Sequence, residues 1–248
     1  MPHTMSRRGT QFDDSVRQHS GWLLPVAIFI ITGLLSALVL LYYLAPNPAS
    51  FIEEHATPTS RSDLVHLSVG GVAFTIPANY LPYGSARKGG ARSDVALYAT
   101  LPDFQGYSED RGPDFTENDA NAPVAYLLIR EEQFNLSEAE RLDRIYLNAV
   151  IQPRGTDGPF GLTQYAFRDD SGYRGEDLFV GHLASGVVVM RCVRFGPQVP
   201  SPSCLRDMPL AHGVALNYRF KRGRLEDWRQ IASGVDRLVA SFMRRDRK

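Results

Sequence analysis

The chain has 248 residues and carries 27 Lys plus Arg against 27 Asp plus Glu, so its formal net charge is zero. A balanced charge gives no long-range field that favours nucleic acid, and we expect no nucleic-acid partner. With 22% charged and 44% hydrophobic residues, the composition excludes a disordered or fibrous chain. The length suits one or two domains.

An uncharged stretch of 23 residues runs from Trp22 to Leu44. As a helix it would be about 34 Å long, enough to cross a bilayer, and it is too long for the apolar part of a cleaved secretory signal. Arginines precede it, which by the positive-inside rule keeps residues 1–21 in the cytoplasm. The sequence therefore predicts an uncleaved signal anchor at residues 22–44, in a single-pass protein of a bacterial inner membrane whose C-terminal domain is periplasmic.

Gly33 and Ala37 form a small-xxx-small pair within this stretch. Such a pair allows two membrane helices to pack closely, so a homodimer through this face is one of two interpretations. The alternative is that these are ordinary small residues of a membrane helix.

Residues 45–63 contain three prolines and no helical or alternating pattern, so we expect a linker. Residues 64–245 then form the periplasmic domain. A hairpin opens it, because residues 65–76 alternate on each side of Gly70-Gly71, and glycines supply the positive φ angles of a two-residue turn. Further strand candidates are residues 94–101, 124–130, 162–168, 177–183, 187–193 and 214–220.

Two helices are predicted from the spacing of apolar residues. Ser137 and Glu140 form a capping box, and an apolar face follows until Pro153 stops the run. A second apolar stripe runs from Leu225 to Met243. The expected fold class is α+β, with an antiparallel sheet of about seven strands, two helices packed on it, and the N-terminal transmembrane helix.

The order of these elements resembles two families. A hairpin ending in Phe-x-Ile-Pro at Phe74–Pro77, a middle helix, antiparallel strands and a last helix closing on Ala-Ser-Phe are similar to the α/β/α sandwich of PsbP-like domains. Between Cys192 and Ile231, the succession of Cys-x11-Cys, Tyr-x-Phe and Leu-x2-Trp-x2-Ile resembles the ends of periplasmic immunity proteins that neutralise lipase effectors of type VI secretion. The second resemblance implies a protein partner.

Cys192 and Cys204 are the only cysteines. In the oxidising compartment predicted for this domain, an even pair favours a disulfide, and closing a loop of about 13 residues should stabilise the fold by about 3 kcal/mol. The alternative is a redox or metal-binding thiol pair, but Cys-x-x-Cys spacing and a second pair of ligands are missing.

No motif in the sequence names a reaction. There is no Gly-x-Ser-x-Gly elbow, no P-loop and no dinucleotide fingerprint, and no two histidines have ligand spacing. We therefore expect no cofactor, no metal and no catalytic residue. His182, near the end of a predicted strand, would be the base of a hydrolase if the chain were one.

The polar segment 102–123 carries six acidic residues against one Arg, interleaved with aromatic residues. This mixture suits docking to a basic partner or a weak calcium site, although a solvated loop is the simpler interpretation. The predicted contacts are Phe104, Tyr107, Asp110 and Asp114.

A second loop, residues 80–92, places Arg87 and Lys88 among glycines between two strands. Flexible basic loops of this kind bind phosphates, lipid head groups or anionic glycans, and plain loops share the same composition.

Three functions remain open. The first is a non-catalytic binding or scaffold module that serves another envelope protein. The second is an immunity-type inhibitor of a periplasmic toxic effector, with the acidic aromatic loop as its contact. The third is a membrane-anchored hydrolase that uses His182 with an acid.

Overall fold

The structure, a computed structural model, describes residues 21–44, 55–133 and 136–243. It divides into two compact units, Met1–Glu53 and Glu54–Lys248. The predicted cytoplasmic tail lies outside the described residues except for Gly21, as do the arginines behind the topology prediction. The predicted boundaries of linker and domain, at residues 45–63 and 64–245, stay predictions.

The first unit contains the helix α1 (Leu23–Leu44). Its described side chains are exposed, including those of Gly33 and Ala37. Over the described residues, no helix meets the length and apolarity that a membrane crossing requires. The predicted span and the predicted helix pairing are therefore unsupported.

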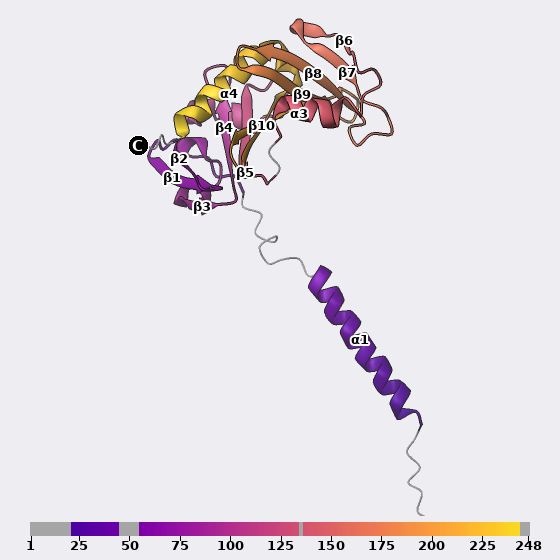
Figure 1. The fold of residues 1–248 in the computed structure, drawn as a ribbon. Coiled ribbons are helices and arrows are strands. Elements are labelled where there is room, and N and C mark those ends of the chain that lie inside the picture. Colours follow the sequence, from indigo (N-terminus) through magenta and orange to yellow (C-terminus); the bar gives the residue numbers. More distant parts are fainter. Residues whose placement is uncertain (1–20, 45–54, 134–135, 244–248) are drawn as a thin grey trace, which may run out of the picture. The chain divides into compact units, whose positions relative to one another are not determined.

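The second unit is an α+β domain with two sheets, as Figure 1 shows. The larger sheet is antiparallel throughout, with eight strands in the order β4-β5-β11-β10-β9-β8-β7-β6. Its strands are β4 (Asp94–Thr100), β5 (Val124–Glu131), β6 (Thr156–Asp157), β7 (Thr163–Ala166), β8 (Glu176–Leu183), β9 (Gly186–Val193), β10 (Ser203–Ala211) and β11 (Val214–Lys221).

The predicted hairpin belongs to a separate three-stranded sheet. β1 (Leu64–Val69) and β2 (Val72–Pro77) pair antiparallel around Gly70 and Gly71, whose φ angles of 54° and 81° confirm the turn. β3 (Gly90–Arg92) adds to β1 in parallel. The prediction of one sheet of about seven strands is thus corrected to two sheets, because β1 pairs with β2 and β3 rather than with a strand of the larger sheet. β3 itself lies inside the segment interpreted as a basic loop.

One face of the larger sheet is covered by α4 (Trp228–Phe242), which a 3₁₀ turn at Arg222–Asp227 precedes. Its apolar stripe is buried in the main core, and Trp228 is 0% exposed. Trp228 packs so closely on β8 that only Gly181, without a Cβ, leaves room for the indole. The predicted terminal helix is confirmed, although its first residues form the 3₁₀ turn.

The opposite face is covered over β8 and β9 by a second core cluster, composed of Tyr146, Val150, Phe167, Leu178, Val180 and Val189. The predicted capping box is present at the start of α3 (Glu138–Arg141). After one turn the helix widens into a π-helical turn at Leu142–Tyr146, in which the amide of Leu147 donates to the carbonyl of Leu142. Asn148 Nδ2 donates to the carbonyl of Arg144, at 2.9 Å. That carbonyl would otherwise accept the amide of residue 148.

β10 is a strand that the sequence analysis missed, and it forms a short seam with β9. The two strands pair only from Cys192↔Cys204 to Met190↔Arg206. Beyond that point Glu138 enters the gap: its Oε1 accepts the amide of Val189 at 2.9 Å, and its carboxylate pairs with Arg206 at 2.6 Å. Arg206 is only 3% exposed, so this ion pair closes the seam from inside.

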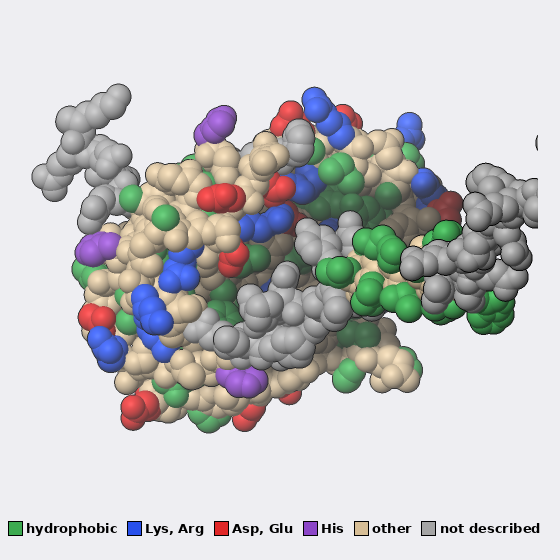
Figure 2. All heavy atoms as spheres, turned by 90° about the horizontal axis from the view of Figure 1, so that it is seen from below, with side chains coloured by type: hydrophobic (Ala, Val, Ile, Leu, Met, Phe, Trp, Pro, Cys, Tyr) green, Lys and Arg blue, Asp and Glu red, His purple; other side chains and the backbone are tan. Residues whose placement is uncertain are grey.

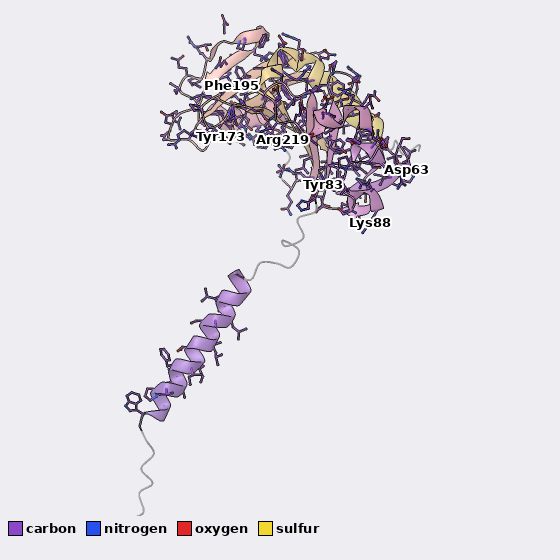
Figure 3. The ribbon with its side chains drawn as sticks, turned by 180° about the vertical axis from the view of Figure 1, so that it is seen from behind. Asp63, Tyr83, Lys88, Tyr173, Phe195 and Arg219 are labelled. Carbon is purple, nitrogen blue, oxygen red and sulfur yellow. A yellow bond between two sulfur atoms is a disulfide. The ribbon has the colours of Figure 1, made fainter. Side chains whose placement is uncertain are left out.

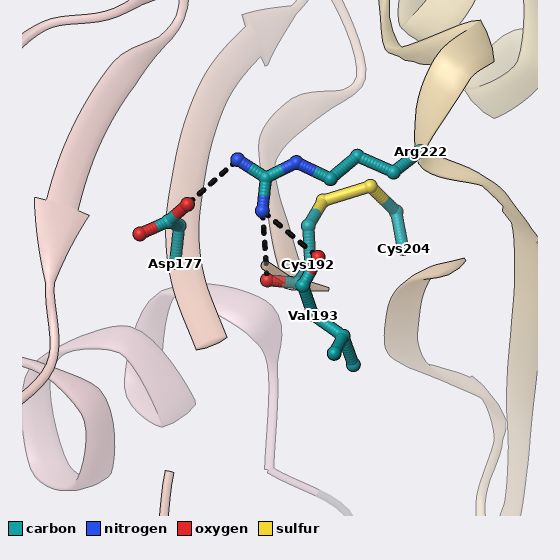
Figure 4. Close-up of a disulfide and its surroundings, with 5 residues drawn as sticks. All are labelled: Asp177, Cys192, Val193, Cys204 and Arg222. Carbon is teal, nitrogen blue, oxygen red and sulfur yellow. Dashed lines mark hydrogen bonds and ion pairs between the residues drawn. A yellow bond between two sulfur atoms is a disulfide. The ribbon is translucent and has the colours of Figure 1, made fainter. Parts of the chain in front are cut away.

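The predicted disulfide is confirmed and lies across the seam, where Cys192 and Cys204 are direct cross-strand partners (Figure 4). Beside it, Arg222 donates to the carbonyls of Cys192 and Val193 and to Asp177. The bond therefore joins the two halves of the sheet at the point where their pairing is shortest.

Candidate functional site

A row of paired residues crosses the open half of the sheet, on the face away from α4. Tyr98 pairs with Tyr126, Tyr126 with Arg219, and Arg219 with Leu205. Cross-strand partners project to the same face, so these four side chains come from β4, β5, β11 and β10 in order. No sequence motif joins them, because they lie far apart along the chain.

Two adjoining recesses lie over this row. One, of about 490 Å³, is mostly apolar and also touches Pro58, Tyr83 and Phe115. The other, of about 310 Å³, extends to Ser201 and Lys221. Both are lined by Thr116, Tyr126 and Arg219, and we call the combined surface the tyrosine groove. Tyr83 and Arg219 are labelled in Figure 3.

Aromatic rings form one wall of the tyrosine groove. The ring of Phe115 lies 4.6 Å from that of Tyr98 and 5.3 Å from that of Tyr107. The Tyr98 hydroxyl is buried and has no hydrogen-bond partner in the described part of the chain. Burial raises the pKa of Tyr98 to about 12, against the opposing charge of Arg87. Tyr98 is therefore neutral at physiological pH, and its hydroxyl is both covered and without a partner in the described part of the chain.

Arg219 supplies the exposed positive charge of the groove. Its guanidinium lies 5.1 Å from the centre of the Tyr126 ring, and no carboxylate in the described ranges pairs with it. Burial raises the pKa of Tyr126, although the positive charge of Arg219 acts in the opposite direction. Burial and the charge of Arg219 both lower the pKa of Lys221. Lys221 Nζ in turn donates to the carbonyl of Ser201 at 3.2 Å. The groove thus combines an apolar floor with a cation free to meet a carboxylate.

The acidic loop is more ordered than predicted, because Arg111 organises it. Arg111 binds Asp114 at 2.9 Å and Asp103 at 3.0 Å, next to the short helix α2 (Gly112–Thr116). Hydrogen bonds from Thr100 and Arg111 outweigh burial and lower the pKa of Asp103. Asp110 is exposed.

Two predicted contacts of this loop have different positions. The ring of Tyr107 packs on that of Phe115, but Tyr107 lines neither recess. Phe104 instead packs on α4, where only a glycine at Gly234 leaves room for its ring, so it serves the core rather than the groove.

The basic loop is tied down at one of its two predicted residues. Arg87 donates to the carbonyl of Leu81 at 2.7 Å and to Thr57 Oγ1 at 2.9 Å. It therefore holds the segment before β1 against the wall of the groove rather than offering a free cation. Lys88 is exposed.

The described residues present no group of three or more His, Cys, Asp or Glu side chains that could hold a metal ion. The histidines visible in Figure 2 lie apart from one another. His182 is exposed on β8, and within the described ranges no hydrogen bond or ion pair joins it to a carboxylate. The arrangement of the groove suits binding by apolar contact, stacking and one charge.

Comparison with known proteins gives one informative likeness. No protein-family model matches the chain, and no curated protein matches it. The fold is similar to that of an immunity protein of the Stenotrophomonas maltophilia type IV secretion system, with a TM-score of 0.51 and 18% identity, over 77% of this chain and 100% of that one. At this identity the likeness shows the fold alone. It supports an immunity-protein-like fold, while the resemblance to PsbP-like domains is not supported.

Proposed function

We propose that the chain is an immunity-type inhibitor that binds a toxic protein through the tyrosine groove. The observation that carries the proposal is the open half of the sheet, where ordered aromatic side chains and an unpaired Arg219 face solvent. An exposed apolar recess with polar groups at its rim is typical of a binding surface. The similarity of the fold to that of an immunity protein of a type IV secretion system gives independent support.

The groove has the composition of an interface centre. Tyr and Arg are enriched among residues that dominate binding free energy, because they bury a large area and keep a polar group for the partner. Phe115 and Tyr126 would supply the desolvated contact. Arg219 would receive an acidic side chain of the partner, and the exposed Asp110 and Lys88 would affect the association rate more than the affinity.

The test starts from the genes beside the one that encodes this chain. A neighbouring product that stops growth when directed to the periplasm is the expected partner, and coproduction of this chain should restore growth. Thr116→Trp places a bulky ring between the two recesses and should abolish the rescue, while weakening binding of the purified partner by at least about tenfold.

Ile151→Trp is the matched control, because Ile151 is 62% exposed and does not line the groove. It should rescue as the unmodified chain does. Rescue by Thr116→Trp at the same expression and melting temperature would contradict the proposal.

Two charge variants distinguish a residue that contacts the partner from one that only affects the association rate. Arg219→Glu should weaken binding at all salt concentrations, because it reverses the charge at the centre of the groove. Neutralising Asp110 should change only the association rate, and mostly at low salt. Equal effects of the two variants would place the contact outside the groove.

We further propose that the second unit acts in the periplasm, attached to the inner membrane through residues 22–44. The cross-strand disulfide and the uncharged stretch support this location. A reporter that requires export should be active when fused after Lys248. Activity of a cytoplasmic reporter at that position would refute the location.

A further inference from the structure

The loop closed by Cys192 and Cys204 is held at several points. Gly196 and Val199 exchange backbone hydrogen bonds of 3.3 and 2.9 Å in a tight turn. Arg222 donates to the carbonyls of Cys192 and Val193 at the start of the loop, and its amide donates to the carbonyl of Pro202 at the end. Three prolines lie between the cysteines. The loop is therefore ordered by covalent, hydrogen-bonded and steric constraints together.

Apolar side chains project from this rigid loop. Phe195, just before the Gly196–Val199 turn, is 55% exposed, and Val199, at the end of the turn, is 37% exposed. Residues 195–203 carry no charge. The guanidinium of Arg222 lies 5.8 Å from the centre of the Phe195 ring, so the ring rests on a fixed support. An exposed aromatic side chain on a rigid loop is the form that a binding anchor takes.

The base of the loop carries an excess of positive charge. Arg194 and Arg222 both pair with the same carboxylate, that of Asp177, at 2.8 and 2.6 Å. Two guanidiniums against one carboxylate leave one positive charge next to the apolar tip.

The loop also adjoins the groove. Ser201, near its end, and Ser203, which begins β10, line the same recess as Thr116 and Arg219. A partner that lies in the groove therefore contacts the end of the loop at Ser201 and Ser203.

We propose that Phe195 and Val199 are a preformed anchor that enters an apolar recess of the protein partner, bordered by acidic side chains that meet Arg194 and Arg222. This inference rests on the proposed function and adds a second contact to it. Because the loop is ordered before binding, little conformational entropy is lost when the anchor is buried. The excess positive charge at the base of the loop is complementary to acidic side chains around such a recess.

The experiment places a photocrosslinking phenylalanine analogue at Phe195, at Thr116 in the groove, or at Ile151 as control, in the full chain in producing cells. We expect the first two positions to crosslink to the same protein and Ile151 not to. With that protein purified, Phe195→Ala should raise the dissociation constant at least about tenfold. Ile151→Ala should leave it unchanged, and Arg194→Gln should reduce the salt dependence of association.

The outcomes separate the two proposals. Crosslinking from Thr116 without crosslinking from Phe195, or unchanged affinity of Phe195→Ala, would overturn the anchor and leave the proposed function standing. Crosslinking from neither position would overturn both. A crosslink to a second copy of the chain, or Phe195-dependent sedimentation with phosphatidylglycerol vesicles, would also overturn the anchor. Phe195→Ala should keep the disulfide and the melting temperature, because the side chain is exposed.

Discussion

The two halves of the larger sheet share one face but use it differently. Over β8 and β9, this face is covered by α3, the π-helical turn and the residues that follow, and it forms the second core. Over β4, β5 and β11, the same face forms the tyrosine groove. The row of paired residues continues from Tyr98 through Arg219 and Leu205 to Arg191 and Leu178, so groove and core belong to one continuous surface.

This difference in how the two halves are covered indicates which part of the sheet is available to a partner. On the α4 side both halves are buried, because α4 spans them in one core. On the other side, the half over β8 and β9 is fully covered by its own chain, whereas the half over β4, β5 and β11 is covered only in part, by Tyr107 and Phe115 against Tyr98. Aromatic side chains that are ordered on the less covered half bury further apolar area only when a partner arrives. The less covered half is therefore where we propose that the partner binds, and the covered half fixes its position.

The strongest way to break the fold common to both halves is to remove the indole of Trp228. Trp228→Ala should lower the free energy of unfolding by about 3 to 5 kcal/mol, because the side chain is fully buried between α4 and β8. Chemical denaturation measures this loss. A loss under about 1 kcal/mol would mean that α4 contributes little to the core. Leu64→Ala is the control, since Leu64 is 60% exposed and should change stability little.

The seam between the halves is expected to be nearly as sensitive. Arg206→Ala should lower the free energy of unfolding by about 3 kcal/mol, because it leaves Glu138 buried without its ion-pair partner. Replacing both residues, as Arg206→Met with Glu138→Gln, should lose less, because no unpaired charge remains and the Gln oxygen still accepts the amide of Val189. Equal losses for the single and double variants would contradict a role for the buried charge.

Local patterns in the sequence explain what could be predicted. The Gly-Gly hairpin, the capping box and the α4 stripe are signals within a few residues of one another, and all three are confirmed. β10 could not be found this way, because a buried Arg206 interrupts its alternation and Pro209 interrupts the strand pattern. The small second sheet depends on β3, a strand too short to give a pattern.

The candidate site, too, could be predicted only where its residues are neighbours in the sequence. Tyr107 and the acidic loop were predicted, since they form one segment of unusual composition. Tyr98, Tyr126 and Arg219 were not, because each belongs to an ordinary strand and only cross-strand pairing brings them together. The signal that could have found them is a polar or aromatic residue at alternate positions on the solvent side of three strands.

The disulfide ties the halves together with a smaller expected effect. Replacing Cys192 and Cys204 by Ser should lower stability by about 2 kcal/mol, less than the loop-closure value because prolines already restrict the unfolded loop. The melting temperature should fall by about 4 to 8 °C. Thiol titration of the unmodified protein without reductant should find no free thiol. Two titratable thiols in a folded sample would contradict the bridge.

The smallest expected change in the free energy of unfolding concerns two hydroxyl groups on the groove side of the sheet. Tyr98→Phe removes a buried hydroxyl that has no partner in the described part of the chain, so stability at neutral pH should stay the same or rise by up to about 1 kcal/mol. Tyr126→Phe should instead lose about 1 kcal/mol, because its hydroxyl donates to the carbonyl of Phe115 at 3.2 Å.

Alkaline pH gives a second measurement of the same contrast. Because burial raises the pKa of Tyr98 from its ordinary 10 to about 12, the unfolded chain loses that proton first as pH rises. The stabilisation linked to Tyr98 is complete below about pH 10 and is lost between pH 10 and 12, so Tyr98→Phe should show a smaller fall in stability across this range. If Tyr98→Phe is instead destabilised at neutral pH by as much as Tyr126→Phe, the hydroxyl has a partner within the fold and is not available to a ligand. If it is stable but binds the partner more weakly, the unused hydroxyl belongs to the interface.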